Sequence, residues 1–509
     1  METKTAAIEM RNITKRFGPV LANDKVWLNI YRGEILALLG ENGSGKTTLM
    51  NMLSGIYFPD EGEIKIDGKE VVIRSPKDAF DNGIGMIHQH FKLVDVLTAA
   101  ENIVLGLPGK LDLKAASAKI REICDKYGFS VDPTQKIYDM SVSQKQTVEI
   151  VKVLYRGADI LILDEPTAVL TPQETDKLFA VLRNMRNDGK AIVIITHKMH
   201  EVEALSDRVA ILRHGQFIGD MLTKDTNAQE MTNMMVGHAV SLNIERPDPV
   251  DPKPRIEVKG LTVRSVDGSI KLDDVSFTAN SGEILGIAGI SGCGQKELLE
   301  AIAGLQTVES GSISYIEDDG SREELIGKDP LSIAELGVSL SFVPEDRLGM
   351  GLVGNMNLAD NMMLRSFRRG KSIFTDRRSP RALAESVVQE LSVSTPSVDT
   401  PVRRLSGGNV QKVLVGREIA SAPTVLLTAY AVRGLDIHSS YTIYDLINRQ
   451  KKAGVAVIFV GEDLDVLLEL CDRILVLCGG KVSGIVPGRG AEKREVGMMM
   501  TKLGGQSHE

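Results

Sequence analysis

Short, unbroken runs of apolar residues recur along the chain, and most are followed by glycine or by a polar side chain. A strand covered on both faces has this pattern, whereas a half-exposed strand alternates apolar and polar residues. Helical patterns separate the runs, and the segment 95–157 is more polar and helix-like. The pattern predicts an α/β fold with a helical insertion. The clearest elements are strands at Ile35–Leu39, Ile160–Leu163, Ala191–Ile195 and Val455–Val460, and a helix at Thr47–Leu53.

The pattern occurs twice. Ile8-Glu-Met-Arg-Asn-Ile-Thr resembles Ile256-Glu-Val-Lys-Gly-Leu-Thr, and Gly33-Glu-Ile-Leu returns as Gly282-Glu-Ile-Leu. A repeat this long indicates a duplicated domain and not a solenoid of short units. The second copy has an insertion in its middle, because the offset between the copies grows towards their C-terminal halves.

The prolines of residues 245–254 mark the join, since proline lacks an amide donor and favours extended backbone. We therefore expect four parts: a first domain over 1–240, a stiff linker over 241–254, a second domain over 255–503 and a tail over 504–509.

Composition narrows the class of protein. A chain of 509 residues suits two or more domains, and its net charge of −8 gives no basic field for nucleic acid. No apolar run approaches the roughly 20 residues of a membrane span, and the N-terminus lacks the apolar stretch of a signal peptide. We expect a cytosolic chain with structural thiols at its cysteines, which are Cys124, Cys293, Cys471 and Cys478.

A complete GxxxxGK[ST] loop follows the first apolar strand and precedes a helix. Its glycines let successive backbone N–H groups turn around phosphate oxygens, and the helix adds its positive end. Lys46 is predicted to reach the β- and γ-phosphates, and the Thr47 hydroxyl to ligate Mg²⁺. The residues expected to contact nucleotide here are Gly40, Asn42, Gly43, Ser44, Gly45, Lys46, Thr47 and Thr48.

Two carboxylates end the apolar run Ile160–Leu163. Asp164 fits a Mg²⁺ ligand, and Glu165 fits a group that orients or deprotonates water. An acidic pair at a strand end is more often a solvated turn, but a phosphate loop in the same domain favours the catalytic interpretation. His197 ends a further apolar run, where a third strand would bring it to the γ-phosphate.

Leu163-Asp-Glu-Pro-Thr-Ala168, with the phosphate loop, Gln89 and His197 in this order, resembles the ATP-binding cassette family. The resemblance covers nearly the whole chain, twice. It implies two tandem P-loop cassettes, each with a RecA-like α/β core and a helical subdomain, which use ATP and Mg²⁺. Its most specific mark is Leu405-Ser-Gly-Gly-Asn409, which is similar to the signature sequence that caps the γ-phosphate of a partner cassette.

The resemblance also implies roles for single residues. Phe17 would stack on adenine, Gln89 would contact Mg²⁺ and the transmembrane partner, and Lys46 would hold phosphate. Glu165 would be the general base and His197 the switch histidine. Ser406, Gly407 and Gly408 of the signature and Asp436 of the D-loop would complete the nucleotide contacts.

The second copy departs from the family pattern at its own catalytic positions. These departures are Ser265 for the aromatic residue, Gln295 for the lysine, Lys296 for the threonine, Glu345 for the glutamine, Ala429-Tyr430 for the acidic pair and Glu462 for the histidine. The first copy in turn has lost both glycines of its signature, which reads Met140-Ser-Val-Ser-Gln144.

These losses fall into one group, because cassettes of this family pair head to tail. The intact phosphate loop of the first copy would meet the intact signature of the second, and the two eroded partners would meet each other. We expect one working ATPase site and one silent site with weak or no nucleotide binding.

Pro344-Glu-Asp-Arg347 and Arg433-Gly-Leu-Asp436 resemble the ATPase subunits of bacterial importers for simple sugars and nucleosides. The stretches His88–Val94, Leu97–Asn102 and Tyr155–Asp159 resemble the nucleoside branch more than the ribose branch. The resemblance implies two permease chains, a substrate-binding lipoprotein and a place on the cytoplasmic face of the membrane.

Three alternatives remain. One is a ribose or galactose importer ATPase. Another is a soluble twin-cassette ATPase acting on ribosomes, a class expected to keep both sites and a long charged linker. The last is a structural or regulatory cassette pair, which would need a damaged first site.

Overall fold

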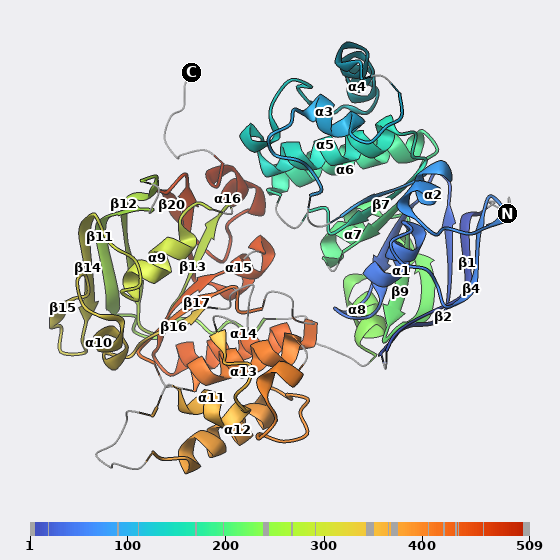
Figure 1. Cartoon of the computed structure of the whole chain (residues 1–509). Helices are drawn as coiled ribbons and strands as arrows, with labels where there is room; N and C mark the ends of the chain where they lie inside the picture. The colour runs from blue at the N-terminus through green and yellow to red at the C-terminus, as the bar shows by residue number, and fades with distance from the viewer. Residues whose placement is uncertain are drawn as a thin grey trace. The chain divides into compact units, whose positions relative to one another are not determined.

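The computed structural model of the chain divides into two compact units, Met1–Ser241 and Leu242–Glu509 (Figure 1). Each unit is described below by itself. The structure describes residues 6–18, 20–88, 91–109, 111–167, 170–196, 198–237, 244–265, 268–290, 292–342, 351–364, 366–367, 375–405, 407–420, 423–432, 435, 437–461 and 463–501.

Unit 1 contains two sheets. The larger sheet has the order β10-β9-β3-β8-β7-β6 and is parallel except for the pairing of β9 with β10. Its strands are β3 (Ile35–Leu39), β6 (Ile84–Ile87), β7 (Ile160–Asp164), β8 (Ala191–Ile195), β9 (Arg208–Arg213) and β10 (Gln216–Leu222). The smaller, antiparallel sheet has the order β2-β1-β4-β5, from β1 (Ala6–Phe17), β2 (Val20–Tyr31), β4 (Glu61–Ile66) and β5 (Lys69–Val71).

The helices of unit 1 fall into a group that flanks the larger sheet and a group that forms a separate lobe. The first group is α1 (Lys46–Leu53), α2 (Pro76–Asp81), α6 (Pro172–Asn187), α7 (Met199–Leu205) and α8 (Ala228–Val236). The lobe holds α3 (Ala99–Val104), α4 (Leu113–Tyr127) and α5 (Val142–Tyr155), at the opposite end of the unit from the antiparallel sheet (Figure 1).

Unit 2 repeats this plan with the sheet orders β16-β17-β18-β13-β19-β20 and β12-β11-β14-β15. Its strands are β11 (Pro254–Arg264), β12 (Ile270–Asn280), β13 (Ile284–Gly289), β14 (Ser310–Ile316), β15 (Arg322–Glu324), β16 (Val338–Phe342), β17 (Val425–Ala429), β18 (Ala456–Val460), β19 (Arg473–Cys478) and β20 (Lys481–Pro487). Its helices are α9 (Gln295–Ile302), α10 (Pro330–Glu335), α11 (Leu358–Met363), α12 (Arg378–Glu390), α13 (Gly407–Ile419), α14 (Ile437–Lys452), α15 (Leu464–Leu470) and α16 (Lys493–Met499).

The central strands confirm the α/β prediction. Every residue of β3, β7, β8, β17 and β18 is buried, as the unbroken apolar runs predicted. Parallel strands covered on both faces bury their whole side-chain set, so no alternation is visible in their sequence. This arrangement brings the carboxyl ends of β3, β7 and β8 to one edge of the sheet.

The extra length of the second copy is spread over several places. The offset between equivalent elements is 249 residues for α1 and α9, 254 for β6 and β16, 259 for α3 and α11, and 265 for β7 and β17. The additions therefore lie in surface connections, which tolerate length changes better than packed elements. The shared core of the two units is preserved.

The proline-rich segment packs against unit 2. The buried guanidinium of Arg246 donates to the carbonyl oxygens of Leu468 and Cys471, at the C-terminal end of α15. The Lys451 ammonium donates to Pro247 O and lies 2.7 Å from Asp472 Oδ1. These contacts make the described part of the linker a fixed strap on the second unit.

Among the residues that the structure describes, no helix has both the length and the apolar character needed to cross a membrane. All four cysteines are free thiols, and Cys124 and Cys471 are buried.

Candidate functional site: a phosphate loop and two strand-end carboxylates

The phosphate loop of unit 1 connects β3 to α1, and two of its glycines are required by close packing. Gly45 has φ 95° at the N-cap of α1, where a Cβ would lie 2.3 Å from Ala22 O. A Cβ on Gly40, at φ 155°, would lie 2.3 Å from Leu212 O. Larger residues would force the backbone apart at both positions, so packing alone fixes the curled path of the loop.

Lys46 is buried inside this loop. Its ammonium group donates to Gly40 O at 2.7 Å and to Glu41 O at 3.0 Å. Burial lowers the pKa of Lys46, and nearby carboxylates, Glu165 foremost, partly oppose that shift. A phosphate would offer this ammonium stronger acceptors than two carbonyl oxygens and would favour its charged form.

The loop suits an anionic ligand. The buried Ser44 hydroxyl has no hydrogen-bond partner among the described residues. A buried hydroxyl without a partner is costly unless a ligand supplies one. With the ammonium of Lys46 and the start of α1, this donor makes a set that fits the phosphates of a nucleotide.

Asp164 ends β7 and meets the start of α1. The Thr47 hydroxyl lies 3.3 Å from Asp164 Oδ2, across the gap between loop and strand end. Burial, followed by the charge of Glu165, raises the pKa of Asp164 from 3.8 to about 6, while Thr47 and Lys46 oppose the shift. A carboxylate and a hydroxyl at this separation form a donor set that suits Mg²⁺, whose charge would restore ionisation.

Glu165 has an unusual backbone. Its φ of 48° lies in the left-handed region that non-glycine residues rarely adopt. Its amide donates to Ile195 O at 2.9 Å, which ties the turn after β7 to the end of β8. Local strain of this kind persists where the surrounding structure fixes it, and such positions concentrate at functional sites.

Phe17, the predicted adenine platform, ends β1 and is 41% exposed. Tyr57 packs edge-to-face against it with ring centroids 5.1 Å apart, and the Lys15 ammonium lies 5.5 Å from its ring centre. The ring is thus held by neighbours and still accessible, as a stacking surface must be.

Unit 2 keeps the loop but not its charge. Gly294 has φ 96° at the N-cap of α9, and a Cβ there would lie 2.5 Å from Lys271 O. The buried amide of Gln295 donates to Ile290 O at 3.2 Å, as Lys46 does to Glu41 O in unit 1. A neutral side chain therefore fills the place of the ammonium.

The other eroded positions of unit 2 also keep their backbone. Lys296 is paired with Glu300, one turn along α9, at 3.5 Å. Tyr430 has φ 56° and donates its amide to Val460 O at 3.0 Å, which repeats the turn of Glu165. Ala429 is buried at the end of β17, where unit 1 has Asp164.

The eroded signature of unit 1 is capped by its own side chains. The Ser141 hydroxyl accepts from the Gln144 amide at 3.2 Å, and the Ser141 amide donates to Gln144 Oε1 at 2.8 Å. This reciprocal capping box uses donors at the N-terminus of α5 that a phosphate would need. In unit 2 the equivalent side chain, Asn409, instead accepts from the Ser394 amide at 3.0 Å.

Several predicted site residues lie outside the described residues, so their placement stays a prediction. They are Gln89, His197, Ser406 and Asp436, and also Glu345 and Glu462 of the second copy. Gly407 and Gly408, by contrast, form the start of α13. Thr47 is exposed, and Thr48, Asn42 and Gly43 lie beside it in the loop and the first turn of α1.

Three features of the site were not predicted. The contact of Tyr57 with Phe17 has no signal in the sequence. Gln146 on α5 donates at 2.5 Å to the carbonyl oxygen of Pro166, the residue that follows Glu165. The equivalent contact in unit 2 joins Gln411 on α13 to Ala431 O at 2.7 Å. The capping box had a visible signal, since Ser141-Val-Ser-Gln144 matches its pattern.

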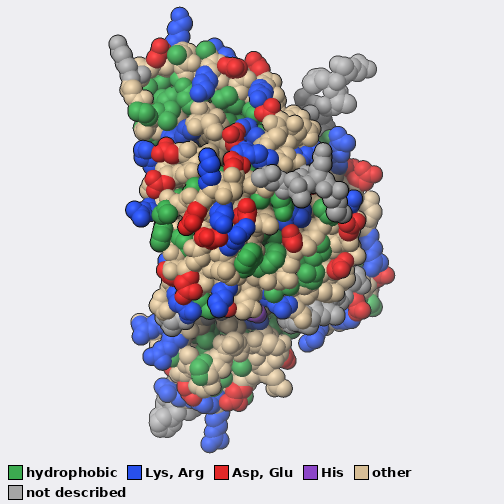
Figure 2. All heavy atoms as spheres, turned by 90° about the vertical axis from the view of Figure 1, so that its right-hand side faces the viewer, with side chains coloured by type: hydrophobic (Ala, Val, Ile, Leu, Met, Phe, Trp, Pro, Cys, Tyr) green, Lys and Arg blue, Asp and Glu red, His purple; other side chains and the backbone are tan. Residues whose placement is uncertain are grey.

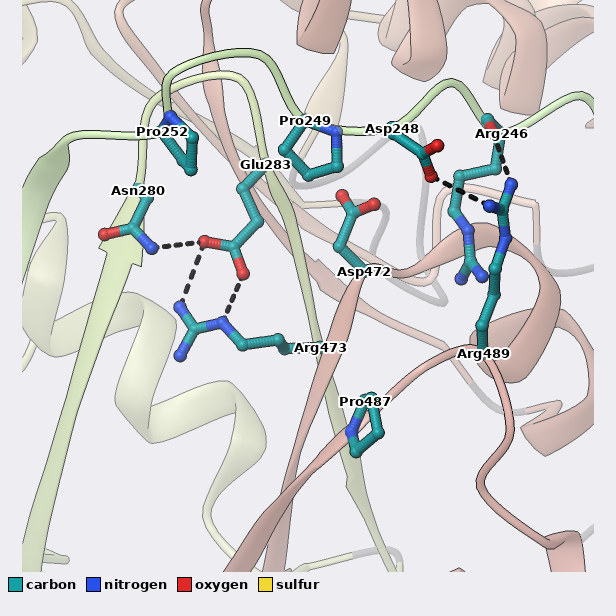
Figure 3. A pocket seen from close by; sticks show the side chains of 10 residues that line it. All are labelled: Arg246, Asp248, Pro249, Pro252, Asn280, Glu283, Asp472, Arg473, Pro487 and Arg489. Atoms are coloured by element: carbon teal, nitrogen blue, oxygen red, sulfur yellow. Dashed lines mark hydrogen bonds and ion pairs between the residues drawn. The ribbon is translucent and has the colours of Figure 1, made fainter.

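A separate cavity of about 350 Å³ lies in unit 2 between the proline-rich segment and the ends of β12, β19 and β20 (Figure 3). Four of its charged side chains form two pairs: Arg473 with Glu283, and Arg489 with Asp248 at 2.8 Å. The cavity belongs to the anchoring of the linker strap and carries no set of donors for a phosphate.

Comparisons with known proteins show which proteins the chain resembles over its whole length. The profile of the family described as ABC transporter matches residues 23–168 and 272–428. The chain is 42% identical to the nucleoside import ATP-binding protein NupA of Lactococcus lactis subsp. cremoris, over 99% of both chains. It is 39% identical to the glucose import ATP-binding protein TsgD13 of Haloferax volcanii, over 98% of this chain and 96% of that one. The guanosine import ATP-binding protein NupO of Bacillus subtilis is 40% identical over 97% of each chain.

The raised pKa of Asp164 predicts a gain in stability when its charge is removed. Ionisation of a carboxyl whose folded pKa is about 6 costs stability as the pH rises from about 4 to about 6. Asp164→Asn should therefore increase the free energy of unfolding of the nucleotide-free protein by about 3 kcal/mol at pH 7. The gain should vanish below about pH 4, where folded and unfolded states both carry the proton.

Scanning calorimetry between pH 4 and pH 8 measures this difference. Asp78→Asn is the control, because the Asp78 carboxyl is half-buried and its pKa is lowered by hydrogen bonds that it accepts from Arg74 N and Ser75. The control should show no gain at pH 7. An Asp164→Asn variant no more stable than the parent at pH 7 would contradict the raised pKa.

Proposed function

From the membership of this chain in the ABC transporter family, we propose that it is the ATPase subunit of a nucleoside importer and works through one composite site. The chain is an ABC transporter ATPase of the nucleoside or sugar import type. The proposal adds three points: the cargo, the residues that act and the silence of the second site.

The observation that carries the proposal is the contrast between two loops with the same backbone. Gly45 and Gly294 have φ angles of 95° and 96° at equivalent N-caps. Lys46 follows the first and Gln295 the second. The side chains that bind phosphate and metal are thus present in one unit and replaced in the other.

In this proposal the residues of unit 1 hold and orient the nucleotide. Lys46 and the loop amides bind the phosphates, Phe17 stacks on the adenine, and Thr47, Asp164 and Gln89 hold Mg²⁺. When bound, Mg²⁺ neutralises charge that develops on the phosphate oxygens. Glu165 accepts the proton of the attacking water, and His197 contacts the γ-phosphate.

The second half of the composite site comes from the other copy. By family resemblance, Ser406, Gly407 and Gly408 cap the γ-phosphate held by unit 1, with Asp436 nearby. The equivalent place on unit 1 is self-capped by Gln144, and Gln295 leaves the loop of unit 2 without an ammonium. Both features support weak or no nucleotide binding at the silent site.

The nucleoside cargo rests on two similarities. The stretches of sequence quoted above resemble the nucleoside branch, and NupA and NupO are slightly more similar to this chain than TsgD13. The differences in identity are small, so an importer of ribose, galactose or another simple sugar is the second candidate. Cargo would contact the partner permeases and the substrate-binding lipoprotein, with this chain peripheral on the cytoplasmic face of the membrane.

The ribosome-associated alternative is disfavoured. That class is expected to keep both sites and a long charged linker, whereas this chain has an eroded site and a short strap on unit 2. Basic and acidic side chains are interspersed on the face drawn in Figure 2, without a continuous basic region there to attract RNA.

Glu165→Gln is expected to bind ATP and to lose at least about 100-fold in turnover, since a general base contributes roughly 10²–10⁴ in rate. Calorimetric ATP binding and phosphate release at saturating ATP separate the two effects. Tyr430→Phe, at the equivalent turn of unit 2, is the control and should keep normal turnover. Retained turnover in Glu165→Gln would remove Glu165 from the role of base.

Ser406→Arg is expected to abolish turnover, because a large cation would occupy the place of the γ-phosphate. Ser141→Arg should do much less, since the equivalent surface of unit 1 faces the silent site. Its main cost is the lost cap of α5, about 1 kcal/mol. Steady-state ATPase rates with thermal midpoints test the pair, and equal losses of turnover would refute the asymmetry.

The cargo is tested with the membrane proteins that copurify with the chain from a detergent extract. Reconstituted with them, the chain should hydrolyse ATP faster in the presence of a nucleoside and its binding protein than with ribose. Glu165→Gln, reconstituted in the same way, gives the background rate. Stimulation by ribose alone would assign the sugar branch, and cosedimentation with ribosomes in a sucrose gradient would overturn the importer.

A further inference from the structure

Glu201, on the short helix α7, is a buried carboxylate outside the predicted site. Its two oxygens each lie 2.6 Å from the Thr167 hydroxyl, and its Oε2 accepts from the Thr196 hydroxyl at 3.3 Å. The Lys198 ammonium lies 3.2 Å from its Oε1. A buried charge is tolerated only where it is paired and hydrogen-bonded, and these contacts meet that condition.

The partners of Glu201 connect two turns at the carboxyl edge of the sheet. Thr167 lies two residues after Glu165, in the turn that follows β7. Thr196 follows β8, and its hydroxyl also accepts from the Lys198 amide at 3.1 Å. Lys198 closes the network by donating to Thr167 O at 3.2 Å. One carboxylate thus links the turn of the proposed base to residues on both sides of position 197.

Unit 2 has lost every polar member of this network. Thr167, Thr196, Lys198 and Glu201 correspond there to Val432, Gly461, Asp463 and Val466, at the offset of β7 and β17. The network is therefore present in the unit that keeps the catalytic side chains and absent from the unit that lost them.

The fold of this region does not require the network. In unit 2 the turn after β17 keeps the left-handed residue Tyr430 and its hydrogen bond to Val460 O. Helix α15 also forms there, with Asp463 as an N-cap that accepts from the Asp465 amide at 2.9 Å.

The equivalent helix of unit 1, α7, has no such cap. Lys198 stands at the N-cap of α7 without a capping hydrogen bond, and a cation at a helix N-terminus is unfavourable. The helix start is therefore capped less favourably in unit 1, which keeps the catalytic side chains, than in unit 2. This difference indicates that Lys198 serves something other than the stability of its helix.

We propose that Glu201 is a positioning residue for ATP hydrolysis. It holds the turn of Glu165 against Thr196 and Lys198 in one fixed arrangement, so that the proposed base meets the attacking water without reorganisation. Glu201 acts through its contacts with Thr167 and Lys198 and does not itself contact the nucleotide. The inference rests on the proposed role of Glu165.

The test is a double-mutant cycle on turnover with Glu201→Gln and Thr167→Val. Each single variant should lower kcat about 10- to 100-fold, since small misplacements of reacting groups have effects of that size. Both should keep KM and the dissociation constant for ATP within about twofold, because Lys46 and the loop are untouched. The double variant should be no slower than the slower single variant, since both changes break one link.

Two controls separate positioning from folding. Thr167→Ser keeps the hydroxyl and should retain kcat within about twofold. Glu203→Gln changes an exposed carboxylate on the same helix, which accepts from the Ala228 amide, and should leave turnover unchanged. Thr167→Val introduces the residue that unit 2 carries at this place, so it should fold even if Glu201→Gln does not.

Three outcomes would overturn the inference: additive losses in the double variant, a loss of ATP affinity as large as the loss of kcat, or normal turnover in Thr167→Val. Glu165→Gln measured alongside separates the two proposals. If that variant is inactive while Glu201→Gln turns over normally, only the inference about Glu201 fails. If Glu165→Gln retains turnover, the proposed function itself fails.

Discussion

The cost of burying charge at the edge of a parallel sheet governs this structure. Lys46 and Asp164 are both buried. Burial lowers the pKa of Lys46 and raises the pKa of Asp164, so it favours the neutral form of each side chain. Carboxylates near Lys46 partly oppose the shift of its pKa, whereas the charge of Glu165 adds to the shift of Asp164. If the site binds a magnesium nucleotide as proposed, the ligand would bring charges of both signs beside Lys46 and Asp164 and would reduce the cost of burying them.

The same constraint applies to the equivalent positions of the second unit. Gln295 and Ala429 stand where unit 1 has the buried Lys46 and Asp164, so unit 2 buries no charge at these two positions. Each substitution therefore removes a charge whose burial is costly.

The buried strands, the phosphate loop and the strand-end carboxylates were predictable because their signals are local. A continuous apolar run, a glycine spacing and an acidic pair can each be recognised within a few residues. The left-handed turn of Glu165 could not be predicted, since φ near 48° is disfavoured for its residue type and is imposed by contacts with β8. The Glu201 network joins residues more than thirty positions apart, and the prolines of the linker gave no sign that Arg246 would be buried on unit 2.

The last glycine of the second loop is required by packing in unit 2, although Gln295 stands after it in place of a lysine. Gly294 cannot be exchanged while Lys271 O lies 2.5 Å from the place of its Cβ, whether or not a phosphate ever arrives. The glycine spacing of such a loop therefore reflects how closely the loop packs against the neighbouring sheet. The lysine and the hydroxyl of the loop, together with the acidic pair at the strand end, are the residues that indicate phosphate chemistry.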